Sequence, residues 1–152
     1  MTTLAVTSES ADEPRVAATP DTVKKFVALG CKAVVQAGAG ARARYADAAY
    51  AAQGATIVSS MTEAVSQADI VLKVRRPEAT EVAAMKKGAL LFCMLAPYDD
   101  RPGLDALAAH GVSAFAMELM PRITRAQVMD VLSSQANLAG YRAVIDAAEV
   151  FG

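Results

Sequence analysis

The sequence predicts a doubly wound α/β fold with a mostly parallel sheet and a long C-terminal helix. Short apolar segments alternate with helix-forming segments along most of the chain, as in a series of βαβ units. The apolar segments lack polar–apolar alternation, which is typical of strands buried on both faces of a parallel sheet. At 152 residues the chain suits one compact domain, and we treat residues 1–152 as that domain.

Six segments are predicted to be strands because they are apolar or β-branched almost throughout. In chain order they are Leu4–Thr7, Lys32–Gln36, Ala55–Val58, Asp69–Val74, Ala89–Leu95 and Val112–Met117. Such an alternating series predicts a sheet of the Rossmann or flavodoxin type.

Capping residues and prolines predict the helices between these strands. Thr19, for example, is a good N-cap, and Pro20 and Asp21 after it suit the first turn of a helix. Four such helices are expected to begin near Pro20, Met61, Pro77 and Pro102, and to end near Gly30, Gln67, Gly88 and Gly111.

The last predicted helix is longer than the others. Thr124 and Gln127 fit a capping box, with Thr124 as the N-cap, and no proline follows before Phe151. Apolar residues recur at three- and four-residue steps along this segment. A helix of this length extends past a domain of this size, so we expect it to cover something besides its own sheet.

Composition excludes several classes of protein. The net charge is −1, which argues against general nucleic-acid binding, and no apolar run is long enough to span a bilayer. Two distant cysteines and one histidine, His110, predict neither a disulfide framework nor a metal site. No secretory signal is recognisable, so the expected location is the cytoplasm.

A glycine-rich turn follows the second predicted strand. Gly38-Ala39-Gly40-Ala41-Arg42-Ala43 fits the pattern GxGxxA, which in dinucleotide-binding folds precedes an acidic residue at the end of the next strand. That next strand ends in Ser59-Ser60 instead. We therefore interpret the motif as a tight turn rather than a cofactor site.

Arg15 and Lys73 are candidate anion-binding residues. Arg15 follows the first predicted strand, and Lys73 lies within the strongly apolar strand Asp69–Val74. A lysine there must pair with an acid or reach the carboxyl-terminal edge of the sheet, where ligands of open α/β sheets bind. The alternative is an ammonium group that merely extends to the surface.

A second candidate site lies at the start of the long helix. Arg122 is in the loop before it, and Gln127, Asp130 and Ser133 follow at three-residue steps. On a helix this spacing places an amide, a carboxylate and a hydroxyl on one face, suited to ribose hydroxyls or a carboxamide. The alternative is a capped helix with a solvated face.

Several sequence blocks occur together in a characteristic order: Pro14–Val23, Ala37–Gly40, Ile70–Val74, Pro121–Gln127 and Leu132–Ala143. The chain resembles the N-terminal region of the alpha subunit of proton-translocating NAD(P) transhydrogenases. Alanine dehydrogenases share this domain, and in them an arginine and a lysine that match Arg15 and Lys73 hold the substrate carboxylate. They also carry a catalytic histidine, for which Met94-Leu95-Ala96-Pro97-Tyr98 offers no counterpart.

The resemblance implies the roles of the second site. In transhydrogenases the matching arginine, glutamine and aspartate contact the nicotinamide ends, so Gln127 and Asp130 are the expected catalytic residues. Together with Arg122 and Ser133 they form the expected cofactor-binding set.

The resemblance also implies cofactors and partners. NAD(H) would bind mainly to a Rossmann domain expected after residue 152, and NADP(H) to a partner component. Two alpha subunits would form a homodimer, and a membrane component would move the proton. This chain alone is expected to be inactive. Its expected location is the cytoplasm, as a soluble domain of a complex at the membrane.

Two alternatives remain open at this point. One is the substrate domain of an alanine-dehydrogenase-like enzyme that uses Arg15 and Lys73. The other is a non-catalytic module for dimerisation or regulation.

Overall fold

The computed structural model describes residues Met1–Phe151. Its contacts divide the chain into two compact units, Met1–Ala116 and a second that begins at Met117. We call them unit 1 and unit 2 and describe each separately.

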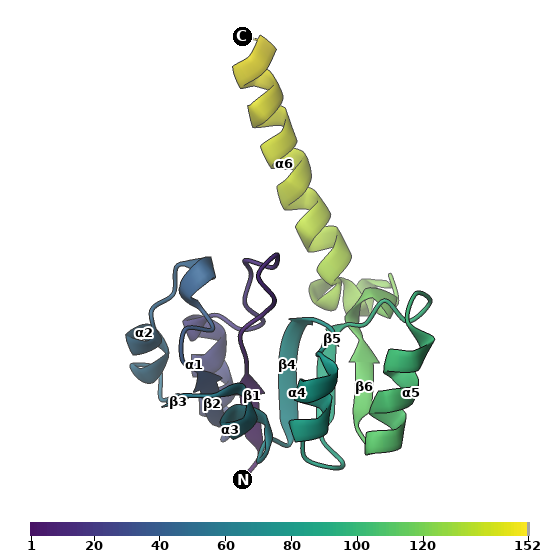
Figure 1. The fold of residues 1–152 in the computed structure, drawn as a ribbon. Helices are drawn as coiled ribbons and strands as arrows, with labels where there is room; N and C mark the ends of the chain where they lie inside the picture. Colours follow the sequence, from purple (N-terminus) through teal and green to yellow (C-terminus); the bar gives the residue numbers. More distant parts are fainter. Residues whose placement is uncertain (152) are drawn as a thin grey trace. The chain divides into compact units, whose positions relative to one another are not determined.

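Unit 1 contains a six-stranded, entirely parallel sheet in the order β3-β2-β1-β4-β5-β6 (Figure 1). All six predicted strands are present, which confirms the predicted fold class. Their bounds are Thr3–Val6 (β1), Lys32–Gln36 (β2), Thr56–Val58 (β3), Ile70–Arg75 (β4), Leu90–Met94 (β5) and Ser113–Ala116 (β6).

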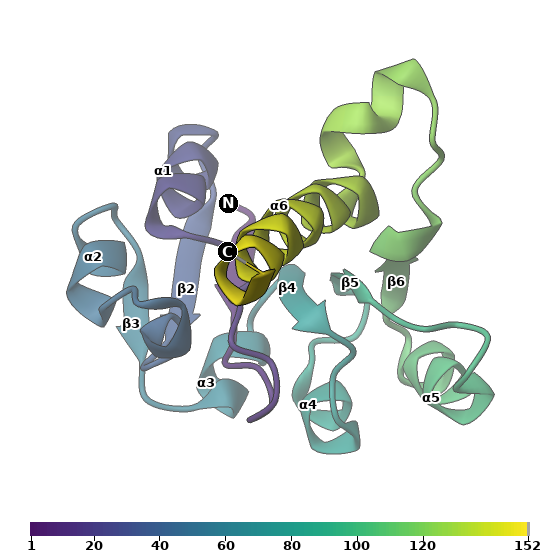
Figure 2. The same ribbon diagram turned by 90° about the horizontal axis from the view of Figure 1, so that it is seen from above.

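Five helices connect these strands. In the view from above, α1 lies over one face of the sheet, whereas α3, α4 and α5 lie over the other (Figure 2). As predicted, Thr19 and Ser60 are N-caps: the side chain of each accepts a hydrogen bond from a backbone N–H group in the first turn of its helix. The bounds are Pro20–Ala28 (α1), Asp47–Ala51 (α2), Met61–Val65 (α3), Ala79–Ala84 (α4) and Arg101–His110 (α5); only α2 was not predicted.

Two apolar clusters form the core of unit 1, one on each side of the sheet. Alternate residues of the central strands belong to each, so that Val34 lies in one cluster and Val35 in the other. Tyr50 of α2 is fully buried in the cluster beside α1, and its hydroxyl donates a hydrogen bond to the Ala18 carbonyl at 2.9 Å. This burial on two sides explains why the central strands β1, β2 and β4 are mostly apolar.

Unit 2 begins with two short 3₁₀ helices, Met117–Leu119 and Thr124–Met129, and continues into α6, Val131–Phe151. The prediction that Thr124 caps the long helix is therefore wrong. The 3₁₀ helix ends at Met129, Asp130 after it has an extended conformation, and the α-helix begins at Val131. Along α6 none of the described residues is buried. No helix within Met1–Phe151 is long and apolar enough to cross a bilayer.

Candidate functional site

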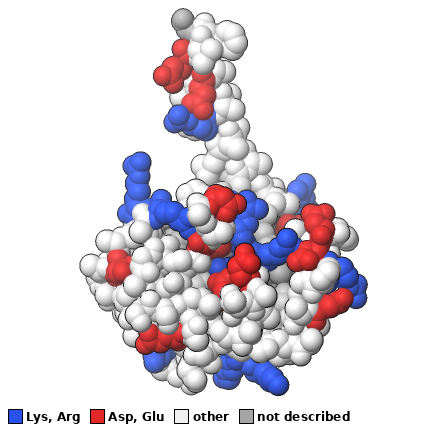
Figure 3. All heavy atoms as spheres, viewed as in Figure 1, with Lys and Arg blue, Asp and Glu red and all other residues white. Residues whose placement is uncertain are grey.

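The strand order of unit 1 reverses between β1 and β4. In open α/β sheets such a reversal separates the loops at the carboxyl-terminal ends of the two strands and leaves a crevice where ligands bind. A hollow of about 520 Å³ lies there, lined by residues after β1 and by the end of β4, among them Glu9, Lys73, Arg75 and Glu81. Side chains of both charges are interspersed on the face of the molecule shown in Figure 3.

Lys73 is buried at this hollow and has an acidic partner, as expected. Its ammonium group donates to Glu81 Oε1 at 2.8 Å, to the Ser8 carbonyl at 3.1 Å and to Thr7 Oγ1 at 3.2 Å. Only 3% of the lysine side chain is exposed. An ammonium group has three N–H donors, so these contacts use all of them.

Glu9 holds the end of β4 from the loop after β1. Its carboxylate accepts the backbone N–H of Val74 at 2.7 Å and of Arg75 at 3.1 Å, and lies 3.8 Å from the Lys73 ammonium group. The pairing of β4 with β5 shifts in register between Leu72 and Arg75. Glu9 therefore supplies acceptors where the ladder at the end of β4 is irregular.

Glu13 is held by two arginines. Arg15 donates to both of its carboxylate oxygens at 2.7 Å, and Arg75 Nε donates to Oε2 at 3.0 Å. The hydrogen bond from the Arg15 side chain is the main cause that lowers the pKa of Glu13 from 4.5 to about 2, and Arg75 adds to it.

The candidate residues Arg15 and Lys73 thus lie at the same end of the sheet but bind different carboxylates. The basic residue that shares a partner with Arg15 is Arg75, which the sequence motifs did not single out. The sequence could have indicated Arg75, because it is a charged residue at the carboxyl-terminal end of the mostly apolar strand β4. The proposed anion-binding role of Arg15 and Lys73 remains a prediction.

The low pKa of Glu13 makes the stability of the protein depend on pH. A carboxyl group with a lowered pKa stabilises the fold above its unfolded-state value, and this contribution is lost as the pH falls through the folded-state value. We expect Glu13 to contribute fully above pH 4.5 and to lose its contribution towards pH 2. Glu13→Gln should therefore flatten the acid side of a plot of the unfolding midpoint against pH. Glu63→Gln, at an exposed carboxyl, is the control, and equal profiles for Glu13→Gln and the unmodified protein would contradict the assignment.

The glycine-rich turn after β2 is a structural turn. The Gly38 N–H donates to both carboxylate oxygens of Asp47 at 2.9 and 3.1 Å, and Gly38 has a positive φ of 76°. A side chain at Gly40 would collide with the Tyr50 ring. The Gly38 amide is thus occupied, and only the short 3₁₀ helix Ala41–Ala43 follows directly, so the turn lacks the long helix whose N-terminus holds a pyrophosphate.

The second candidate site lies in unit 2, at the start of α6. Asp130 Oδ1 accepts the backbone N–H groups of Leu132 and Ser133, each at 3.0 Å, and Oδ2 accepts the Ser133 hydroxyl at 2.6 Å. Asp130 therefore caps α6. The pKa of its carboxyl group is lowered, mainly by the hydrogen bond from the Ser133 hydroxyl. The Arg122 guanidinium is 3.9 Å from Oδ2, which makes it a loose ion pair.

Gln127 is not on the same helix as Asp130 and Ser133. It lies in the 3₁₀ segment Thr124–Met129 with its side chain exposed, and the extended residue Asp130 separates it from α6. The prediction that the three residues share one helical face is therefore wrong, because only Ser133 lies within α6 and the extended Asp130 precedes that helix. The four polar residues nevertheless occur within one short stretch of unit 2, between Arg122 and Ser133.

The segment after β5 has no histidine at the place expected for the catalytic histidine of a dehydrogenase. Ala96 there has a positive φ of 48°, an unusual conformation for a residue other than glycine. The one histidine, His110, ends α5, and its Nε2 lies 2.8 Å from the Met85 carbonyl, to which it binds. Among residues 1–151, no group of acidic, histidine or cysteine side chains could hold a metal ion.

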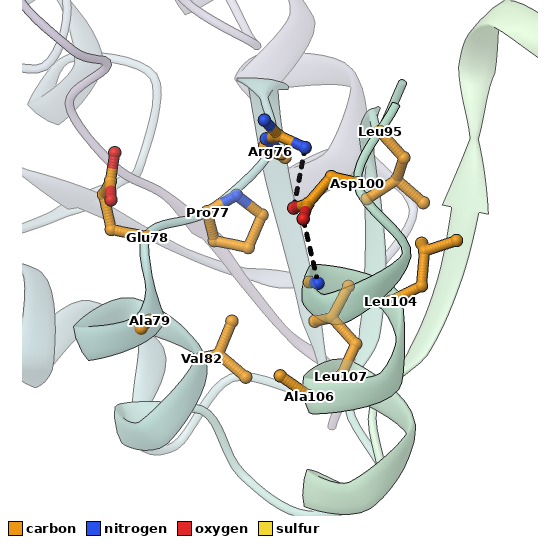
Figure 4. A pocket seen from close by; sticks show the side chains of 11 residues that line it. Arg76, Pro77, Glu78, Ala79, Val82, Leu95, Asp100, Leu104, Ala106 and Leu107 are labelled. Atoms are coloured by element: carbon orange, nitrogen blue, oxygen red, sulfur yellow. Dashed lines mark hydrogen bonds and ion pairs between the residues drawn. The ribbon is translucent and has the colours of Figure 1, made fainter. Parts of the chain in front are cut away.

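A second hollow, of about 290 Å³, lies between α4 and α5 (Figure 4). Arg76 NH1 and Asp100 Oδ2 form an ion pair at 2.7 Å beside it, and Val82, Leu104 and Leu107 make its apolar wall. Asp100 also caps α5 through the Gly103 N–H at 3.2 Å. The ion pair and cap tie together the loops after β4 and β5.

Gly103→Ala is expected to destabilise the protein by about 1 kcal/mol, although alanine usually favours a helix over glycine. The added methyl group would occupy the position of the Asp100 carboxylate, so the cap and its ion pair would be displaced. Urea unfolding measures the change. In an Asp100→Ala background the same substitution should instead stabilise; a stabilising Gly103→Ala in the unmodified protein would contradict this account.

Comparisons with known proteins agree with this architecture. Residues 5–139 match the family model described as alanine dehydrogenase/PNT, N-terminal domain. A subunit alpha protein of the NAD(P) transhydrogenase of Rhodospirillum rubrum is 55% identical over 144 residues, which are 91% of this chain and 38% of that protein. Alanine dehydrogenase of Mycolicibacterium smegmatis is 34% identical over 129 residues, covering 85% of this chain and 34% of the relative.

A solved structure, the transhydrogenase of Sinorhizobium meliloti, superposes with a TM-score of 0.92 at 48% identity. The match covers 97% of this chain and 44% of that one. The chain thus spans less than half the length of the relatives it matches.

Proposed function

Because the chain belongs to the alanine dehydrogenase/PNT N-terminal domain family, we propose that it works as the first domain of a transhydrogenase alpha subunit. In this proposal the complete enzyme transfers hydride between NAD(H) and NADP(H) and couples the transfer to proton translocation. The observation that carries the proposal is the 55% identity with a transhydrogenase subunit over 91% of the chain, against 34% with an alanine dehydrogenase.

The wall of the hydride-transfer site is assigned to Arg122, Gln127, Asp130 and Ser133. Amide, carboxylate and hydroxyl groups suit the carboxamide and ribose of a nicotinamide nucleotide, so this part of the chain fits that end of the cofactor. The glycine turn after β2 does not fit the pyrophosphate, because Asp47 already binds the Gly38 amide. The main nucleotide site is therefore assigned to a second domain.

Positioning is the task of these residues. The bound nicotinamides supply the hydride chemistry, and a protein accelerates such a transfer chiefly by fixing the two reactants in a reactive geometry. Two hydrogen bonds to backbone amides fix the Asp130 carboxylate, which in turn orients the Ser133 hydroxyl. The exposed Gln127 amide lies three residues before this fixed group.

The alanine-dehydrogenase alternative is less well supported by the site in unit 1. Oxidation of an amino acid needs a general base, and the segment after β5 supplies no histidine. The three donors of Lys73 are already bound to protein acceptors, and Arg15 is bound to Glu13. A substrate carboxylate would have to displace these partners.

The partners follow from the same proposal. They are a Rossmann domain of the same subunit, a second alpha subunit, an NADP(H)-binding component and a membrane component. The location is the cytoplasmic side of the membrane that holds that component.

Gln127→Asn in the complete enzyme tests the proposed site. Shortening the side chain by one methylene misplaces the amide, so hydride transfer with both nucleotides saturating should slow by about tenfold. Gln53→Asn, the same substitution in unit 1 after α2, should leave the rate unchanged. A rate equal to that of the unmodified enzyme would rule out the positioning role of Gln127, and alanine-dependent formation of NADH would favour the alternative function.

A further inference from the structure

The segment that carries Gln127 contains a single buried residue, Ala126. Only 5% of Ala126 is exposed, and it is the one buried residue among those that the structure describes in unit 2. It belongs to the 3₁₀ helix Thr124–Met129, whose other five residues are exposed. A buried alanine and an exposed glutamine thus follow each other directly in the chain.

The geometry of a 3₁₀ helix links the orientations of these two residues. Such a helix has three residues per turn, so side chains three positions apart lie in one row, and adjacent side chains point about 120° apart. Gln127 shares its row with Thr124. Ala126 shares the next row with Met129, which is 48% exposed. Within these six residues Ala126 is therefore the only side chain whose burial turns the row of Gln127 outwards.

Hydrogen bonds of the backbone hold Gln127 from both sides. The Ala126 N–H donates to the Ile123 carbonyl at 2.9 Å. The Asp130 N–H donates to the Gln127 carbonyl at 3.3 Å. The side-chain amide of Gln127 has no hydrogen-bond partner among residues 1–151. Its direction therefore follows from its backbone, which lies between the buried Ala126 and the residue that caps α6.

We propose that Ala126 is a positioning residue of the hydride-transfer site, and that the small size of its side chain determines where the Gln127 amide lies. This inference rests on the proposed function, in which Gln127 orients a nicotinamide. A methyl group fits the buried position, whereas a larger side chain must displace the 3₁₀ helix, since closely packed sites have no room for added methyl groups. A displacement of about 1 Å can slow a reaction by about a hundredfold.

Ala126→Val in the complete enzyme tests the inference. The two added methyl groups should slow hydride transfer by about tenfold with both nucleotides saturating, and should change the KM of either nucleotide by less than about twofold. Ala126→Ser adds one oxygen atom only and should keep the rate within about twofold of the unmodified enzyme. The control is Ala64→Val, which adds the same bulk to an alanine of α3 in unit 1 that is 1% exposed. It should lower the stability of the protein without slowing hydride transfer.

A double variant shows whether Ala126 acts through Gln127. The amide is already misplaced in Gln127→Asn, so adding Ala126→Val should slow that variant by no more than about twofold. An equal loss in both backgrounds, or an Ala126→Val enzyme as fast as the unmodified one, would overturn the proposal. An equal loss in Ala64→Val would also overturn it, because the cause would then be general destabilisation. Hydride transfer by the unmodified enzyme and its loss in Gln127→Asn test the proposed function separately, so the two failures are distinct.

Discussion

Replacing Lys73 with methionine is expected to lower the free energy of unfolding by about 3–5 kcal/mol, as measured by urea denaturation. The Lys73 side chain is 3% exposed, and its ammonium group lies 2.8 Å from Glu81 and 3.8 Å from Glu9. Methionine fills a similar volume but leaves both carboxylates near a site without positive charge. The cost is therefore that of uncompensated buried charge rather than of a lost contact.

A double variant separates the cost of uncompensated buried charge from the cost of a lost contact. Lys73→Met combined with Glu81→Gln removes one charge of each sign, so it should cost less than the sum of the two single changes. Arg101→Ala breaks an ion pair with Asp105 in which both side chains are more than half exposed, and it should change stability by less than about 0.5 kcal/mol. Additive effects of Lys73→Met and Glu81→Gln would show that the buried pair is not coupled.

If the proposed function holds, Asp130→Ala in the complete protein is expected to slow hydride transfer by about a hundredfold with both nucleotides saturating. Alanine removes the cap of α6 and releases the Ser133 hydroxyl, so two of the proposed wall residues lose their fixed positions. Asp130→Asn keeps the capping oxygen, since asparagine caps helices as well as aspartate does, and should lose at most about tenfold.

The comparison between these variants identifies what Asp130 contributes. Equal losses in the alanine and asparagine variants would indicate that its charge matters rather than its position. Asp146→Ala is the control, because Asp146 belongs to an exposed ion pair with Arg142 further along α6. Circular dichroism checks that the helix persists, and an unchanged rate in Asp130→Ala would remove Asp130 from the proposed site.

Local sequence signals predicted most of the fold. The strands were recognisable because most of their residues are apolar and those of β1, β2 and β4 pack on both faces of the sheet. Thr19 and Ser60 cap their helices as expected. The start of the long helix was misplaced because the capping-box pattern at Thr124 was taken as its first turn, whereas the helix begins after Asp130, six residues later. Asp130 caps the helix, since its carboxylate binds two backbone amides at the first turn of α6.

The partners in the hollow beside β1 and β4 were beyond prediction from local sequence. Lys73 was expected to need an acid, but Glu81 is eight residues away on α4 and Glu9 lies on the loop after β1. Only the strand order brings these segments together. The shared binding of Glu13 by Arg15 and Arg75 likewise joins residues two and sixty-two positions apart, which no periodic pattern indicates.

At the end of β4 the carboxylate of Glu9 accepts the hydrogen bonds that the backbone of a neighbouring strand would otherwise accept. It satisfies the two amides at the end of β4, so β1 ends at Val6 and the backbones need not continue side by side. The separation of the two loops is thereby set by the reach of one side chain. Substitution at this single position can change the width of the hollow while the hydrogen-bonded ladder of the sheet below stays as it is.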